Sequence, residues 1–290
     1  MLRIAHVSIA VALLFPLAAA GPSVASTTTA ITVPDDDGED EAGPTDEEVE
    51  AAVAELEAVL EEGAFDEKVA ALVKARAMQH EDMAKAVATA VKDDSKEVRI
   101  AAIDALGHIR VGAALKSLHG FAKKKALVEE EDQAVAIFKA IGRHGDTDSI
   151  KVLEDDLSGS SRTVAEARIL ALGKIRHEKS VEALIAIMNK SGKGKKGNVG
   201  QHMDEIRLAL HVLTGADEGT NRKNWQSWWN DNKHDIEVDP DGPAELDGKL
   251  GRTWRRFWDE EEKATDGAEK EREDGDDDEG GDGGAPPARS

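Results

Sequence analysis

Residues 101–107 read AAIDALG, and related stretches follow at residues 136–142 (AIFKAIG) and 167–173 (ARILALG). The final glycines are 35 and 31 residues apart, and apolar residues also recur eight and eleven residues after each glycine. Matches at so many offsets indicate an internal repeat. A looser fourth copy contains Ile206, Ala209 and Gly215, and we align it on Gly215.

Each repeat unit predicts a helix, a short turn and a second helix. In the first helix, alanines four residues apart allow neighbouring helices to approach closely, and the glycine is expected to form a left-handed cap that ends the helix. In the second helix, apolar residues three apart form a buried stripe. Ser95, Thr163 with Glu166, and Thr45 with Glu48 are expected to cap helix starts.

One helix pair cannot bury its own apolar face, so the units are expected to stack. We predict an all-α fold, an α-solenoid of about five stacked helix pairs over residues 45–234. A lone helix at 45–62 precedes a degenerate first pair at 66–77 and 81–91. Residues 235–262 are expected to form a linker and a short terminal aromatic helix. No stretch alternates with a period of two, so no sheet is expected.

Residues 1–25 have the layout of a secretory signal peptide. Arg3 precedes a mainly apolar run over residues 4–20, and Ser23-Val24-Ala25 fits a cleavage site after Ala25. An uncleaved anchor is the alternative, but the run is short for a membrane span and contains Pro16. We therefore expect export to the periplasm or the extracellular space, with no membrane span after signal cleavage.

The charge of the chain is concentrated near its ends. The formal net charge is -22, with 14 Asp/Glu and no Lys/Arg over residues 35–62, and 14 acidic against 4 basic residues over 259–290. The polar segments 26–44 and 263–290 are predicted to be a disordered acidic linker and a disordered acidic tail. This balance argues against a nucleic-acid partner. The absence of Cys excludes disulfides and thiolate metal sites.

The Ala-Leu-Gly phrase, followed by a turn and an apolar second helix, resembles HEAT-like repeats of the phycobilisome-lyase type. Leu213-Thr214-Gly215, followed by Trp225, Trp228 and Trp229, resembles the terminal unit of exported bacterial HEAT-repeat proteins. The resemblance implies a non-enzymatic scaffold or adaptor, although fold analogy alone does not assign a function.

All five tryptophans fall within residues 225–258, in two sets with helical spacing. Each set would form one aromatic face of a helix. The faces comprise Trp225, Trp228 and Trp229 in the first set, and Trp254, Phe257 and Trp258 in the second. We expect the first set to seal the end of the core and the second to dock a final helix. An exposed platform for a peptide or glycan is the alternative, and Arg252, Arg255 and Arg256 would then favour an acidic ligand or the chain's own tail.

Two His-Glu pairs, His80-Glu81 and His177-Glu178, hint at metal chemistry, since a HEAT-like hydroxylase builds a di-iron site from such pairs. The two pairs are about 97 residues apart and begin second helices, so we interpret them as helix-start residues. We expect no catalytic residues, no metal ligands and no cofactor.

The expected function is a protein–protein interaction scaffold that binds an unknown protein partner on the concave face of the solenoid, which the second helices should line. The candidate contact residues are Lys116, His119, Lys151, Glu154 and Glu182, with Lys193, Lys195 and Lys196 in a basic loop. Two alternatives remain open: a module that binds envelope polysaccharide through its Trp faces, and a lyase or metal-dependent hydroxylase of the HEAT type.

Overall fold

The computed structural model describes residues 44–157, 159–190, 202–240, 242, 246 and 248–259. These described residues contain helices and no strand, which confirms the all-α prediction. The expected signal peptide, both acidic extensions from residues 26–43 and 263–290, and the basic loop with Lys193, Lys195 and Lys196 lie outside the described residues.

The α-helices of the described residues are α1 (Asp46–Glu62), α2 (Phe65–Ala75), α3 (Glu81–Thr89), α4 (Lys96–His108), α5 (Gly112–Ala122), α6 (Lys125–Val128), α7 (Glu131–His144), α8 (Ile150–Glu154), α9 (Arg162–Lys174), α10 (Glu178–Lys190), α11 (Met203–Thr214), α12 (Arg222–Asn232) and α13 (Gly248–Trp258). Two short 3-10 helices, η1 (Ala90–Lys92) and η2 (Thr147–Ser149), follow α3 and precede α8.

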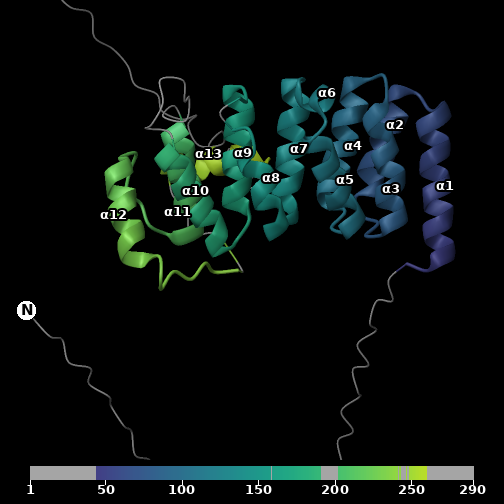
Figure 1. Ribbon diagram of the computed structural model, residues 1–290. Helices are drawn as coiled ribbons and strands as arrows, with labels where there is room; N and C mark the ends of the chain where they lie inside the picture. The colour runs from purple at the N-terminus through teal and green to yellow at the C-terminus, as the bar shows by residue number, and fades with distance from the viewer. Residues whose placement is uncertain are drawn as a thin grey trace, which may run out of the picture. The chain divides into compact units, whose positions relative to one another are not determined.

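The helices lie in two rows (Figure 1). The first-helix row contains α2, α4, α7, α9 and α11, each packed against the next. The second-helix row contains α1, α3, α5, α8, α10 and α12. Five successive pairs, from α2–α3 to α11–α12, therefore follow the single helix α1. One large apolar core runs between the rows, and the central residues of the repeat, Leu106, Ile141 and Leu172, are fully buried in it.

The repeat glycines have a different role from the one expected. Gly107, Gly142 and Gly173 are buried in the last turns of α4, α7 and α9 and have no left-handed backbone. A Cβ added to Gly107 would lie 2.9 Å from both Cα and Cβ of Ala140 in the next first helix. The glycine therefore allows two helices to touch. The left-handed caps are Gly145 and Gly215, with φ of 68° and 72°.

The same contact corrects the alignment of the fourth repeat. Gly142 faces Ala171, and Gly173 faces Ala209 at 2.9–3.0 Å in the same manner. Ala209 is thus the counterpart of Ala171, two residues before the glycine position, and His211 occupies that position. Our alignment on Gly215 was wrong by one helical turn, because Gly215 is a cap rather than a packing residue.

The helix caps explain where several helices begin. The Thr45 hydroxyl accepts a hydrogen bond from the Glu48 backbone N–H and Glu48 bonds back to Thr45, as the sequence predicts. Ser95 caps α4 in the expected way. The prediction for Thr163 was wrong: α9 begins at Arg162, and Ser161 is the residue whose hydroxyl accepts from the helix.

Candidate binding surfaces

The second-helix row is interrupted at α8, which has only five residues. The buried guanidinium of Arg168, on α9, donates hydrogen bonds to the backbone oxygens of Val152 and Asp155 at the end of this helix. It also stacks 3.9 Å from the ring centroid of Phe138. Arg168 therefore caps the last carbonyl groups of α8, which have no partner within the helix.

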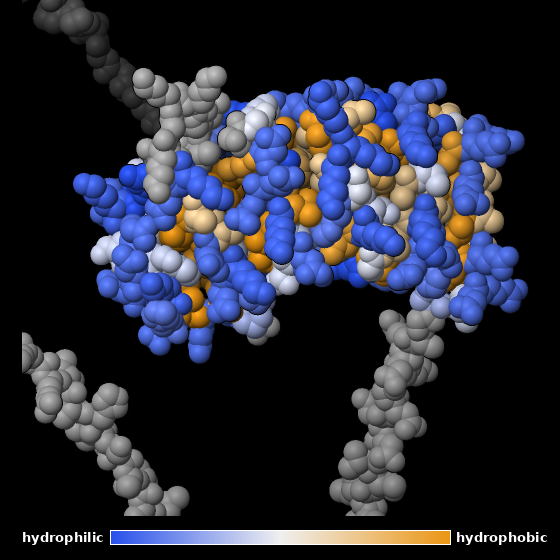
Figure 2. Space-filling view, in the orientation of Figure 1, coloured by the Kyte–Doolittle hydropathy of each residue, from blue (hydrophilic) through white to orange (hydrophobic). Residues whose placement is uncertain are grey.

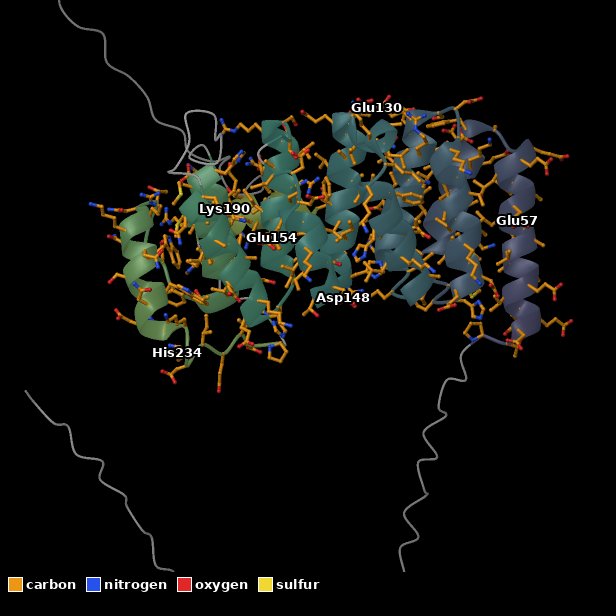
Figure 3. All side chains as sticks on the ribbon, viewed as in Figure 1. Glu57, Glu130, Asp148, Glu154, Lys190 and His234 are labelled. Atoms are coloured by element: carbon orange, nitrogen blue, oxygen red, sulfur yellow. The ribbon has the colours of Figure 1, made fainter. Side chains whose placement is uncertain are left out.

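A groove of about 440 Å³ lies between α8 and α10, and we call it the mixed-charge groove. It is lined by Thr147, Asp148, Ile150, Lys151, Glu154, Lys179, Glu182, Ala183 and Ala186. Asp148 and Glu154 are labelled in Figure 3. Charged side chains of both signs surround the apolar Ile150, Ala183 and Ala186 in this groove. In the space-filling view, apolar patches show between hydrophilic side chains on this face of the molecule (Figure 2).

The structure brings together three of the five helical contact residues that the sequence suggested, Lys151, Glu154 and Glu182. Lys116 is exposed on α5 and does not line the groove. His119 is half-buried, and its Nε2 lies 2.8 Å from Ser149 Oγ. Burial lowers the pKa of His119, with a smaller contribution from Lys123. This histidine joins α5 to η2 rather than presenting a free imidazole.

The first tryptophan set closes the end of the core, as expected. Trp225 is fully buried, and its Nε1 donates a 2.8 Å hydrogen bond to the backbone oxygen of Gly219. Trp228 meets it edge to face with 5.6 Å between ring centroids. Trp228 and Trp229 are half-buried against the core. These contacts account for the first set as packing residues.

The second set docks α13 on the first-helix row. Trp254 and Trp258 are 3% and 4% exposed and pack with Leu170, Leu208 and Val212 of α9 and α11. Phe257 is partly buried beside them. In the view of Figure 1, α13 lies behind the other helices. Rings this deeply buried do not offer the exposed platform that glycan binding requires.

The two His-Glu pairs begin helices. Nδ1 of His80 accepts from the Asp82 backbone N–H at 3.2 Å, and Nδ1 of His177 accepts from the Lys179 N–H at 3.1 Å. The helix-start interpretation is therefore confirmed for both histidines. No three His, Cys, Asp or Glu side chains within the described ranges come together as a group able to hold a metal ion.

A basic surface that the sequence analysis overlooked lies along the ends of the first helices. Arg143 and Lys174 directly follow a repeat glycine, and Arg110 and Arg176 stand three residues after one. The repeat therefore carried a signal, basic residues at two fixed places after the glycine. Cations are favourable there because helix carboxyl ends carry partial negative charge.

We call the main pocket on this surface the basic cleft. It has a volume of about 510 Å³ and is lined by Arg76, Asp104, His108, Arg110, Arg143, Lys174, Trp258 and Asp259. A neighbouring pocket of about 450 Å³ shares Arg110, Arg143 and Lys174 and adds Arg176 and Trp254. Lys174 Nζ lies over both indoles, 5.8 Å from the Trp254 centroid and 5.1 Å from that of Trp258.

Arg176 lines the neighbouring pocket and contacts the chain segment that follows α12. Its Nη1 donates to the Val212 backbone oxygen at 3.2 Å, and its Nε donates to the Asp239 backbone oxygen. Burial lowers the pKa of Arg176, and the nearby Asp239 opposes that effect. The guanidinium thus holds the connection between α12 and α13 against α11.

Comparison with known proteins gives no relative: no model of a known protein family and no curated protein sequence matches this chain. None of the helices in the described part of the chain is both long and apolar enough to cross a membrane.

Proposed function

We propose that this protein is an exported, non-enzymatic α-solenoid of HEAT-like repeats that binds another protein along its second-helix row. The expected signal peptide supports export. The glycine–alanine contacts between successive first helices support the repeat architecture, because each unit meets the next in the same manner. Such stacks generate extended surfaces, and binding through them requires complementarity of form and charge rather than reaction chemistry.

The observation that carries the proposal is the mixed-charge groove. Short α8 leaves a depression in the row, and Lys151, Lys179 and Glu182 line it with apolar Ile150 and Ala183 between them. An extended peptide segment could place an apolar side chain in the groove and charged side chains against its rim. Lys151, Glu154 and Glu182, which the repeat pattern suggested as contact residues, all line this groove, and that supports the proposal.

The alternatives have less support. The buried state of Trp254 and Trp258 leaves the polysaccharide-binding hypothesis with the half-buried Trp228 and Trp229 alone. The metal-dependent hydroxylase alternative depended on His80 and His177, and both side chains are engaged with helix N-termini.

The test is a charge exchange that keeps the net charge constant. The full chain carrying Lys151→Glu with Glu182→Lys is used as bait in an envelope extract, beside wild type and a matched control, Glu57→Lys with Lys223→Glu. Both control positions are exposed and lie outside the groove. The proposal expects a protein that wild type and control recover and the groove variant does not. Identical recovery by all three baits would contradict it.

A further inference from the structure

The basic cleft has more positive charge than its own carboxylates neutralise. Asp104 is shared, since it pairs with Arg76 and, at 2.5 Å, with Nη1 of Arg143. Arg110 is exposed, and among the described residues no carboxylate pairs with its guanidinium. A cluster of this kind in a chain of net charge -22 indicates a site for a negatively charged group.

The helix dipoles explain only part of this arrangement. Each first helix places its carboxyl end here, and one cation per end would complement the partial charge. Arg143 is already engaged by Asp104 and Asp259. Arg110, in contrast, is exposed and lines the basic cleft, and no carboxylate of the described residues pairs with it. The surplus therefore points outward, toward something that occupies the pocket.

The chain itself supplies a candidate occupant beside the cleft. α13 runs back along the first-helix row, because Trp254 lies near Gly173 of α9 and Trp258 lies against Gly142 of α7. The next residue, Asp259, already pairs with Lys139 at 2.7 Å and with Arg143 at 3.7 Å. The described chain therefore ends with a carboxylate at the edge of the cleft.

The residues that follow are strongly acidic. Residues 260–290 contain 13 Asp/Glu and 4 Lys/Arg, and they begin with Glu260-Glu261-Glu262. Residues attached at the edge of a site are present at a high effective concentration, of the order of millimolar for short flexible connections. Carboxylates that bind Arg guanidinium groups form strong charge-assisted hydrogen bonds.

We propose that the basic cleft is a binding site for carboxylate-rich peptide and that its resident occupant is the chain's own acidic segment, residues 260–290. The inference is independent of the mixed-charge groove, which lies on the second-helix row. An acidic peptide from another protein would bind the cleft only by displacing the chain's own segment. Because single exposed ion pairs are weak and are screened by salt, the docked state requires several contacts and weakens as ionic strength rises.

The absence of Cys allows a direct experiment on the full chain. A nitroxide attached through Thr265→Cys broadens the amide NMR signals of residues that lie near it. The proposal expects salt-sensitive broadening at Arg110 and Lys174 in the cleft and none at Glu182 in the groove. Arg110→Glu, which breaks no ion pair among the described residues, should reduce the docked fraction by about threefold.

Arg252→Glu is the matched control, because Arg252 is exposed on α13 and does not line the cleft. This variant should leave the broadening at Arg110 and Lys174 unchanged. Broadening that responds to Arg252→Glu but not to Arg110→Glu would overturn the proposal in favour of the exposed side of α13. Uniform broadening over the surface, or none, would also overturn it. These outcomes do not bear on partner recovery through the groove, so the two proposals fail separately.

Discussion

A Cβ added to Gly142 would stand 2.9 Å from Cη2 of Trp258, so this glycine is the point at which α13 meets the first-helix row. Gly173 repeats the relationship with Trp254 at 3.4 Å. The same glycines also face alanines of the next first helix. One residue position in the repeat therefore serves two purposes: it allows helices to stack, and it receives the indoles of the terminal helix.

Substitution of Trp258 should release α13 while the two rows stay folded. Trp258→Ala removes a large buried side chain, a change that typically costs about 3–5 kcal/mol when the whole contact is lost. α13 packs through a small separate cluster, so it can open locally. Hydrogen exchange should become fast in α13 and remain slow in α7.

Trp258→Phe is the control, because the indole Nε1 is buried without a hydrogen-bond partner and its loss costs only volume. This variant should keep most of the protection in α13. Loss of protection in α7 together with α13 would show instead that the terminal helix belongs to one cooperative unit with the rows.

Trp225 should be the most important tryptophan for the stability of the main core. It is fully buried and bonds to Gly219. Trp225→Ala should lower the free energy of unfolding by about 3–5 kcal/mol, and Trp225→Phe by about 1–2 kcal/mol for the lost hydrogen bond and the smaller ring. Urea unfolding followed by circular dichroism measures both. Trp229→Ala, at a half-buried position, should cost less than Trp225→Ala, and an equal cost would contradict the assigned roles.

Arg168 should stabilise the fold around the short helix α8 of the second-helix row. Arg168 is 6% exposed, and its guanidinium donates to backbone oxygens of Val152 and Asp155 and stacks on Phe138. Arg168→Met leaves those carbonyls without a donor, and we expect a loss of about 2–4 kcal/mol in thermal or urea unfolding. Arg168→Lys should recover only part of it, because an ammonium lacks the planar fork. Full stability of the Met variant would contradict this role.

Asp217 gives the clearest pH dependence. Two hydrogen bonds from Arg207, at 2.6 and 2.5 Å, lower the pKa of Asp217 from 3.8 to about 2. A carboxylate whose pKa is lowered by folding stabilises the fold above its unfolded pKa, and that contribution disappears as the pH falls through about 2. Because the side chain is about one-third exposed, we expect Asp217→Asn to cost only about 1 kcal/mol at pH 7.

The stability difference between wild type and Asp217→Asn should therefore shrink as the pH is lowered from 4 toward 2 in urea titrations. Arg207→Gln should show the same pH profile, since it removes the other half of the pair. A difference that stays constant over this interval would mean that Asp217 does not titrate as the structure implies.

The sequence predicted most of the features that depend on spacing within one helix, although the Thr163 cap was wrong because Ser161 caps α9. The repeated Ala-Leu-Gly phrase, the Thr45 and Ser95 caps and the helical spacing of the tryptophans all follow from local geometry, and each corresponds to what the structure shows. Lys151 and Glu182 stand nine residues after their repeat glycines, and Glu154 stands twelve residues after its glycine, so all three could be placed on one face of the second helices.

Features that depend on contacts between helices could not be predicted in this way. A glycine at a helix end is compatible with a left-handed cap and with close packing, and only the position of Ala140 distinguishes the two for Gly107. The end of α8 is capped by Arg168 of the following helix, a contact that the spacing within α8 does not reveal. The basic cleft forms because several units place the carboxyl ends of their first helices side by side. Its arginines do not share one position in the repeat, since Arg143 directly follows its repeat glycine and Arg110 stands three residues after one.

The central claim, that successive units meet through facing glycine and alanine, is tested most directly by a double-mutant cycle on Gly107 and Ala140. Gly107→Ala should cost about 1–3 kcal/mol by overpacking, and Ala140→Gly about 1 kcal/mol as a glycine within a helix. Ala140→Gly relieves the contact with the Ala140 methyl, although the Ala140 Cα would still lie 2.9 Å from the added Cβ, so the double variant should be more stable than the sum predicts by about 1 kcal/mol. Gly107→Ala combined with Ala171→Gly, which do not face each other, should be additive. Additivity within about 0.5 kcal/mol for the Gly107 and Ala140 pair would contradict the stacked arrangement.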